Sequence, residues 1–492
     1  MKKIMVYITV FTAGMLTMIL EFSGTRIIAP YFGSSLYTWT SMIGVILGSL
    51  SIGYWIGGKL ADKKPTFSIL SYALLINALS CFLLSVFADK LLTFLLDTGI
   101  RTDIGALIST VLLFSIPSIL FGVVSPYSVK LQLNSLKSSG RTVGNLYAVA
   151  TIGSIVGTFL SGYYLLSTFE STHLILGISV ILLVNALILA PRQFLALKLS
   201  GIGIIFLLGT LIQPTHYRFS THQFSEIVPS SYNDYYILED AQEDRTMRFL
   251  LTDFRSTQSG YTVGDNSQLF GSFAKFFTLP ACFGVNDHIL MIGGGGYSYP
   301  KYFLETFPKH KIDVVEIDPK LTQIAEDHFE LDRKNPNLKI INEDGRVFLN
   351  QNSKKYSSVI IDAFDTDIIP FQLNTQEAFQ KMHNAIATNG LLIVNIHSSF
   401  DIDQITLLDA EFKTLRTVFS KVEIYQVNPS HEYSEKQGFI IVGYKGYPKV
   451  ETNCLVSDEG LFENKIEHQE KAGVPIFTDS FAPVEYYLMK GN

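Results

Sequence analysis

The sequence is poor in cysteine. Only three of its 492 residues are cysteines, Cys81, Cys282 and Cys454, and they lie far apart. None forms a Cys-x-x-Cys motif, and no cysteine and histidine stand at the spacing of metal ligands. We therefore expect neither a metal site nor a disulfide framework.

The second half of the chain is short of basic charge. Residues 1–215 hold 13 Lys and Arg against 6 Asp and Glu, a balance of +7, whereas residues 216–492 have a balance of −13. Binding to nucleic acid depends on Lys and Arg at the phosphates, so we exclude nucleic acid as a partner. The acidic balance favours solubility and is also compatible with a cationic substrate.

The first half consists of long apolar runs, which a soluble enzyme lacks. Each run is close to the length that crosses a bilayer. Lys2 and Lys3 precede the first run and no small-residue cleavage site follows, so we interpret it as a transmembrane helix and not as a signal peptide. The sequence therefore predicts a multi-pass protein of the cell membrane, in contact with lipid. The predicted spans are Ile4–Leu20, Thr38–Gly57, Ile69–Phe87, Ile104–Val124, Val143–Leu166, His173–Ala190 and Leu197–Ile212.

Positive charge collects in alternate loops between these spans. The loops with more Lys and Arg should face the cytoplasm. Seven spans would then place the second half outside the cell, where adenosine-type cosubstrates are scarce. The last span is the weakest, and Leu91–Ile100 is an alternative half-helix, so we predict a cytoplasmic second half. Near the end of the first span, Glu21 and Arg26 are expected to form a structural ion pair; a functional pair is the alternative.

The second half is organised around residues 288–318. A short apolar strand, His288–Ile292, runs directly into four glycines, Gly293 to Gly296, and a helix and a second strand follow. Glycine lacks a Cβ atom, so it allows a tight turn and lets a ligand approach the backbone. Glu316 ends the second strand about 20 residues later, where a carboxylate accepts the hydroxyls of a ribose. This order predicts a nucleoside-binding βαβ unit.

Two further strands end in acidic residues. Leu338–Asn342 is followed by Glu343, Asp344 and Gly345, and Tyr356–Ile361 is followed by Asp362, Asp365 and Asp367. Parallel strands meet ligands at their carboxyl ends. We therefore interpret the second group as carboxylates for a cation or for proton transfer, with a solvated turn as the alternative.

From about Tyr232 to Tyr486 the sequence resembles the spermidine synthase family of aminopropyltransferases, and most of all its bacterial membrane-fused members. Methyltransferases share only the first two of the motifs that carry this resemblance. It implies a transferase of polyamine and spermidine biosynthesis. The motifs are IGGGG, VVEIDP (Val314–Pro319), EDGR (Glu343–Arg346), the pair Asp362 and Asp365, IPFQLNTQEAF (Ile369–Phe379) and TDSFAPVEY.

The resemblance also implies roles for single residues. Asp362 would be the base that takes a proton from the attacking amine, because a protonated amine cannot attack carbon. Gln258 and Asp365 would bind the amine substrate. No cofactor would be bound permanently, and S-adenosylmethionine or its decarboxylated form would be the cosubstrate. The residues that would hold its nucleoside are Gly293, Gly294, Gly295, Glu316, Asp344 and Gly345.

Two departures from the family leave the donor open. The family has an Asp after the third glycine, where this chain has Gly296, and its Tyr-His/Gln-Glu run has no counterpart in Asp265–Phe273. Intact S-adenosylmethionine becomes easier to accept. The alternatives are therefore methyl transfer or cleavage of S-adenosylmethionine in the same pocket, or a transporter or sensor with a ligand-binding domain.

These patterns together predict the organisation of the chain. Residues 1–215 form a transmembrane domain of about seven helices. Residues 216–280 form a connector with a small β-region, which includes strands at Tyr235–Glu239 and Met247–Thr252. Residues 281–492 form an α/β Rossmann-like domain of the S-adenosylmethionine-dependent methyltransferase type. A homodimer is left open as its assembly.

Overall fold

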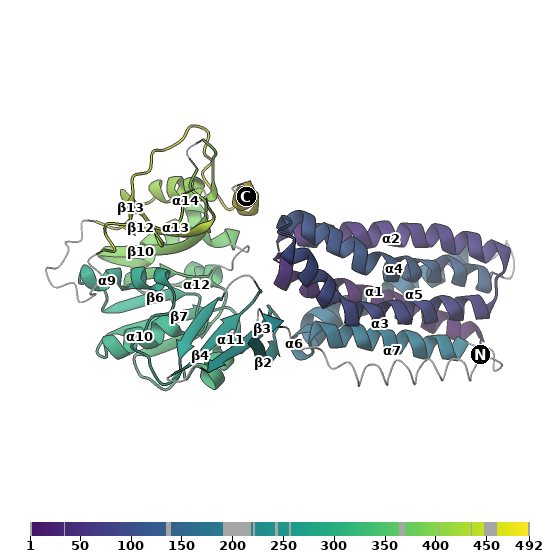
Figure 1. Ribbon diagram of the computed structural model, residues 1–492. Helices are drawn as coiled ribbons and strands as arrows, with labels where there is room; N and C mark the ends of the chain where they lie inside the picture. Colours follow the sequence, from purple (N-terminus) through teal and green to yellow (C-terminus); the bar gives the residue numbers. More distant parts are fainter. Residues whose placement is uncertain are drawn as a thin grey trace. The chain divides into compact units, whose positions relative to one another are not determined.

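The computed structural model shows a helical part and an α/β part (Figure 1). The chain divides into two compact units, Met1–Tyr235 and Tyr236–Asn492, and each is described separately below. The structure describes residues 2–33, 35–133, 139–189, 218–219, 222–241, 245–254, 257–363, 370–401, 403–433, 435–446 and 460–490.

The first unit contains six helices that are long and apolar enough to cross a bilayer, within the residues that the structure describes. They confirm a long apolar helix at each of the first six predicted spans, and the seventh, Leu197–Ile212, lies outside the described residues. The proposed half-helix at Leu91–Ile100 is wrong, because α3 continues without a break to Asp97. The helices are α1 (Lys2–Phe32), α2 (Leu36–Lys63), α3 (Phe67–Asp97), α4 (Thr102–Gln132), α5 (Ser139–Leu160) with η2 (Ser161–Leu165) and α6 (Leu166–Thr168), and α7 (Ser171–Leu189).

Glycines allow these helices to pack closely. A Cβ atom on Gly153 would lie 2.1 Å from the carbonyl oxygen of Phe11, and one on Gly157 would lie 2.3 Å from that of Met15. Helices in lipid associate through such contacts between small residues and backbone. Gly162, by contrast, has open space around it.

Arg26 does not pair with Glu21, so the predicted ion pair is wrong. The guanidinium lies 3.3 Å from Asp234 and also donates to the backbone oxygens of Ser230 and Ser231. Residues 230–234 are far from Arg26 in the sequence, and no helical spacing could have shown this contact.

The predicted small β-region is present. β1 (Arg218–Phe219) pairs with β2 (His222–Pro229), and β3 (Asp234–Ala241), β4 (Thr246–Leu251) and β5 (Ser259–Thr262) form an antiparallel meander.

The second unit is built on an eight-stranded sheet. Its order is β13 (Lys465–Ile466), β11 (Lys421–Gln426), β12 (Gln437–Tyr444), β10 (Ile386–Ser398), β9 (Tyr356–Ile361), β6 (His288–Ile292), β7 (Lys311–Glu316) and β8 (Leu338–Asn342). The strands from β10 to β8 are parallel, and β12 is antiparallel to both of its neighbours. This confirms the predicted Rossmann-like fold.

Helices cover both faces of this sheet. Along β6, Leu290 and Ile292 face α12 (Gly345–Gln351), α13 (Gln376–Ala385) and α14 (Leu407–Arg416). The alternate residues Ile289 and Met291 face η4 (Ser272–Thr278) and α10 (Ser298–Thr306). Both sets are buried, which is why β6 is apolar from Ile289 to Ile292 and does not alternate with polar residues.

Two local expectations differ from the structure. The apolar spacing over Leu269–Leu279 predicts a helix that leads to Pro280, but the structure has the 3₁₀ segment η4 there, followed by α9 (Leu279–Cys282), after Gly271 at φ 83°. Cys282 is disulfide-bonded, whereas Cys81 is free and buried. The sequence pattern predicts no disulfide framework and does not indicate the bridge at Cys282, because sequence separation does not measure distance in the fold.

Candidate active site

A cavity of about 130 Å³ lies at the carboxyl edge of the large sheet. It opens where the glycine loop leaves β6 and where β9 and β10 end. In an open parallel sheet this is the place where the strand order reverses and ligands bind. The cavity is lined by Thr257, Gln258, Ser259, Phe270, Phe273, Ala274, Phe277, Met291, Gly294, Gly295, Ser298, Tyr299, Asp362, Asn395, Ile396 and His397.

The glycine loop needs its glycines. Gly293 has φ 95° and Gly295 has φ 51°, in the left-handed region that residues with a Cβ atom rarely adopt. A Cβ atom on Gly293 would lie 2.2 Å from the carbonyl oxygen of Asp362. The loop therefore touches the end of β9. The glycines that are predicted to bind the nucleoside of the cosubstrate lie directly against Asp362, the predicted base.

Ser259 of β5 holds the loop from the other side. Its Oγ accepts a hydrogen bond of 2.9 Å from the backbone N–H of Gly296. A Cβ atom on Gly296 would lie 2.9 Å from the Cβ of Ser259. An aspartate at this position would therefore displace Ser259, which gives a physical reason for the departure from the family pattern.

Glu316 is buried at the end of β7 and contacts the loop. One carboxylate oxygen accepts from the N–H of Gly294 at 2.7 Å and the other from that of Asp318 at 2.9 Å. Burial raises the pKa of this carboxyl, and the backbone hydrogen bonds oppose the rise. Each oxygen keeps a further lone pair, so the carboxylate can still accept hydroxyl groups.

Asp344 and Gly345 lie one strand further along the sheet edge, outside the cavity lining. The Asp344 side chain caps α12 by accepting from the backbone N–H groups of Arg346 and Val347 at 2.8 and 2.9 Å. A Cβ atom on Gly345 would lie 2.6 Å from Ile292. Helix capping and close packing thus explain why an aspartate and a glycine stand at these positions. Their contact with the nucleoside stays a prediction.

Asp362 projects into the cavity directly after β9. Among the described residues its side chain has one hydrogen-bond partner, Asn395, whose Nδ2 donates to Oδ1 at 2.9 Å. The loss of water around the carboxyl raises its pKa to about 6, and the Asn395 hydrogen bond partly opposes this rise. A carboxyl that titrates near pH 6 is suited to take a proton at neutral pH.

Gln258 reaches the same cavity from the loop before β5. Its Oε1 is buried and has no hydrogen-bond partner in the part of the chain that the structure describes. The second predicted amine ligand, Asp365, lies outside the described residues, as does Asp367. Among the residues that the structure describes, no group of three or more His, Cys, Asp or Glu is placed to hold a metal ion.

Several cavity residues escaped the sequence reasoning. Asn395 and His397 lie near the end of β10, and Phe270, Phe273 and Phe277 form an aromatic wall. Asn395 interrupts an otherwise apolar strand, and a polar residue there was the available signal. The aromatic residues carried no signal, because at helical spacing they are usual core residues.

Comparison with known proteins gives three related findings. Residues 276–453 match the family model of the spermine/spermidine synthase domain. A polyamine aminopropyltransferase of Vibrio vulnificus is 32% identical over 144 residues, which is 29% of this chain and 46% of that protein. Polyamine aminopropyltransferase 2 of Aquifex aeolicus is 23% identical over 421 residues, or 80% of this chain and 78% of that protein.

The match to the Vibrio relative therefore spans about half of that protein's length. The crystal structure of a probable spermidine synthase from Corynebacterium glutamicum aligns with 51% of this chain and 95% of that chain. The two are 19% identical, with a TM-score of 0.42.

Proposed function

We propose that this chain, whose residues 276–453 match the spermine/spermidine synthase domain, is a membrane-bound aminopropyltransferase. It would move an aminopropyl group from decarboxylated S-adenosylmethionine to a diamine such as putrescine and release methylthioadenosine. One observation carries the proposal most: Asp362 projects into the cavity beside the glycine loop with a pKa of about 6.

The polar atoms of the cavity favour a cationic ligand. Asp362 is a carboxyl, and the side-chain oxygens of Gln258 and Asn395 are buried without a hydrogen-bond partner among the described residues. Buried acceptors of this kind cost free energy until a donor reaches them, and an ammonium group supplies up to three donors. The aromatic wall suits the methylene chain between two amines.

The same lining favours a donor without a carboxylate. None of the described lining residues is Lys or Arg. The carboxylate of intact S-adenosylmethionine would therefore find no permanently charged cation in this lining, where His397 is the one described residue that can become cationic, while Asp362 would repel it. This supports the decarboxylated donor over the intact one.

The proposed reaction gives each of the predicted site residues a role. The amine must lose a proton before its lone pair attacks the methylene carbon next to the sulfonium. Asp362 would accept that proton while the carbon–sulfur bond breaks and methylthioadenosine leaves. The glycine loop and Glu316 would hold the ribose end of the nucleoside, and Asp344 and Gly345 would contact its adenine. Asp365 would bind the amine substrate.

Product analysis tests the proposal. Purified full-length protein is given decarboxylated or intact S-adenosylmethionine, each with and without putrescine, and products are identified by mass spectrometry. We expect methylthioadenosine and spermidine together, and only with the decarboxylated donor and putrescine. Release of methylthioadenosine from the intact donor without putrescine would instead establish a cleaving enzyme, and a methylated product would establish a methyltransferase.

Nucleoside binding is tested separately. Glu316→Ala should weaken methylthioadenosine binding, because the ribose would lose a charged acceptor worth roughly 1.5–3 kcal/mol per hydrogen bond. Calorimetry with the wild type and with Glu343→Ala, an acid that follows the neighbouring strand β8, provides the reference. Equal affinity in all three proteins would remove Glu316 from the site.

A further inference from the structure

The helical unit has two ends that differ in charge. At the first, which we call the lysine end, α2 finishes at Lys63 and α3 begins at Phe67. Lys130 of α4 pairs with Asp62 there at 2.7 Å, and Tyr127 donates to the backbone oxygen of Lys64. The C-terminus of α7 is at this end too, because Ser71 near the start of α3 donates to the backbone oxygen of Ala186.

The opposite end, which we call the arginine end, contains the contacts of Arg26. The guanidinium donates to the backbone oxygens of Leu166, Ser230 and Ser231 at 3.0, 2.5 and 2.7 Å. It also pairs with Asp234, whose other oxygen accepts from Ser171, the first residue of α7. Asp234 is only 6% exposed, so its ion pair with Arg26 is shielded from water, whereas the hydrogen bond to Ser231 is exposed.

The two ends of α7 therefore locate the exit of the chain from the first unit. Leu189 lies at the lysine end, and residues 230–234 lie at the arginine end beside Ser171. The 19 residues of α7 span about 28 Å, close to the hydrocarbon thickness of a bilayer. The first unit ends at Tyr235, so the chain leaves it at the arginine end.

Basic residues identify the side of the membrane. At the lysine end Lys59, Lys63, Lys64, Lys130 and Arg141 accumulate, next to the N-terminal Lys2 and Lys3. At the arginine end, Arg26 and Arg101 are each paired with an aspartate, and Lys90 is the remaining basic residue of the described spans there. An excess of Lys and Arg marks the cytoplasmic side. The arginine end thus faces away from the cytoplasm.

The disulfide at Cys282 is an independent observation that agrees with this side. Disulfides persist in oxidising compartments and are rare in the cytosol, where thiols are kept reduced. Cys81 of α3, which lies among the membrane helices, is by contrast a free thiol.

From the Arg26 contacts, the distribution of basic residues and the Cys282 disulfide, we propose that the second unit faces the non-cytoplasmic side of the membrane. The cavity beside Asp362 then draws its ligands from that compartment. This is the opposite of the side that we predicted from the sequence, where the need for a cytosolic donor decided the choice. The topology does not depend on the reaction that the cavity performs.

Thiol labelling of the full chain tests the topology. Lys334→Cys places a thiol on the exposed surface of the second unit, and Lys64→Cys places one at the lysine end. Sealed right-side-out vesicles are treated with a membrane-impermeant maleimide, and the parent chain sets the background. We expect Lys334→Cys to react in sealed vesicles and Lys64→Cys to react only after permeabilisation. The reverse pattern would overturn the proposal.

The disulfide gives a second readout. Cells are quenched in acid, the protein is alkylated under denaturing conditions without reductant, and free thiols are counted by mass spectrometry. We expect one free thiol out of three cysteines, and three free thiols would contradict the proposed compartment. Neither readout involves catalysis, so an inactive protein with this labelling pattern would remove the proposed function alone.

Discussion

Two regions of the α/β unit each hold an aspartate at the carboxyl edge of the sheet, and they treat it in opposite ways. In the cavity, Asp362 accepts a side-chain hydrogen bond from Asn395 alone among the described residues, and its pKa is raised to about 6. At the start of α14, Asp409 is almost fully buried but has several donors, and their combined effect lowers its pKa despite the burial.

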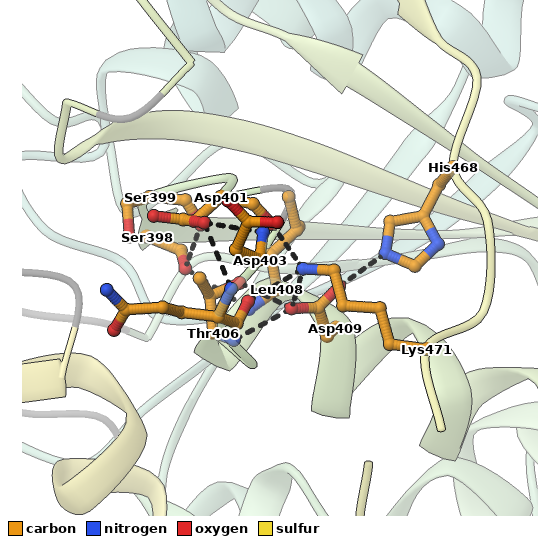
Figure 2. A network of polar contacts seen from close by, with 10 residues as sticks. Ser398, Ser399, Asp401, Asp403, Thr406, Leu408, Asp409, His468 and Lys471 are labelled. Atoms are coloured by element: carbon orange, nitrogen blue, oxygen red, sulfur yellow. Dashed lines mark hydrogen bonds and ion pairs between the residues drawn. The ribbon is translucent and has the colours of Figure 1, made fainter. Parts of the chain in front are cut away.

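Figure 2 shows the network around Asp409. Its carboxylate accepts from His468 and Lys471 at 2.8 Å each, and from the backbone N–H and the hydroxyl of Thr406 at 2.7 and 3.0 Å. Lys471 also donates to the backbone oxygens of Asp401 and Gln404. The network therefore joins the C-terminal segment to the loop between β10 and α14.

The comparison teaches that the number of hydrogen-bond donors, more than burial, decides whether the pKa of a buried carboxyl is raised or lowered. Full pairing keeps Asp409 ionised and leaves it no capacity to take a proton at neutral pH. Sparse pairing leaves Asp362 basic enough to do so. The predictions below test this contrast in order of decreasing effect.

The largest effect is expected at the sparsely paired aspartate. Asp362→Asn removes the base but keeps the size of the side chain, so turnover should fall by roughly 10²–10⁴-fold while donor binding is retained. Folding should be unharmed, because a carboxyl with a raised pKa costs stability when it ionises. Turnover and methylthioadenosine affinity, measured on the same sample, check this. A variant with normal turnover would show that Asp362 is not the base.

The second effect is expected at Asp409, the fully paired aspartate, where a substitution should reduce stability and leave turnover unchanged. Asp409→Ala should lower the free energy of unfolding by about 3–5 kcal/mol, because Lys471 would lose its carboxylate partner in a buried site. Turnover per folded molecule should stay close to that of the wild type. Glu470→Gln is the matched control: it removes the more exposed ion pair with Lys413 and should cost less than about 1 kcal/mol. Equal losses in the two variants would contradict the comparison.

Glu411, two residues along α14, extends the comparison to a carboxyl with no donor. It is fully buried, neither oxygen has a partner among the described residues, and burial raises its pKa well above 4.5. A raised folded pKa means that stability falls as the pH rises from about 4.5 towards the folded pKa. Glu411→Gln should remove this fall, which is about 1.4 kcal/mol for each pH unit that separates the folded pKa from the unfolded one. Thermal unfolding from pH 4 to pH 9 measures it, and parallel curves would contradict the prediction.

The smallest effect is a change in pH dependence. Because the Asn395 hydrogen bond partly opposes the rise in the pKa of Asp362, Asn395→Ala should raise that pKa further. The loss of a bond worth about 0.5–1.5 kcal/mol moves a pKa by roughly 0.4–1.1 pH units. The rising limb of kcat/KM should therefore move to higher pH, with much of the rate recovered above it. Ile396→Val, also in the cavity lining, should leave the limb in place.

Much of the fold could be predicted because its signals are local. Apolar runs identified the first six spans, and strand, glycines, helix and strand identified the βαβ unit from His288 to Asp318. In the structure the helix that follows is capped locally as well: Asp318 precedes Pro319, and its side chain accepts from the N–H of Lys320 at 2.9 Å. Such signals need only neighbouring residues.

The remainder depends on contacts between distant residues. The pairing of Arg26 with Asp234 joins residues 208 positions apart. Asn395 of β10 donates to Asp362, which follows the neighbouring strand β9. Ser259 reaches Gly296 from a different sheet. No periodicity in the sequence encodes these distances. The contacts of Asn395 and Ser259 in the cavity, and the Cys282 disulfide, could therefore be identified only from the structure.

The close approach of Gly293 to Asp362 has a consequence for how such a site can change. The glycine loop of the proposed nucleoside site packs directly on the backbone of Asp362, the proposed base. Any side chain at position 293 would press on the carbonyl oxygen of Asp362. Under the proposed function, a substitution at position 293 would therefore disturb nucleoside binding and proton transfer together. Variation that widens or narrows the substrate range has to enter from the opposite side of the cavity, where Gln258, Ser259 and the phenylalanines belong to other elements.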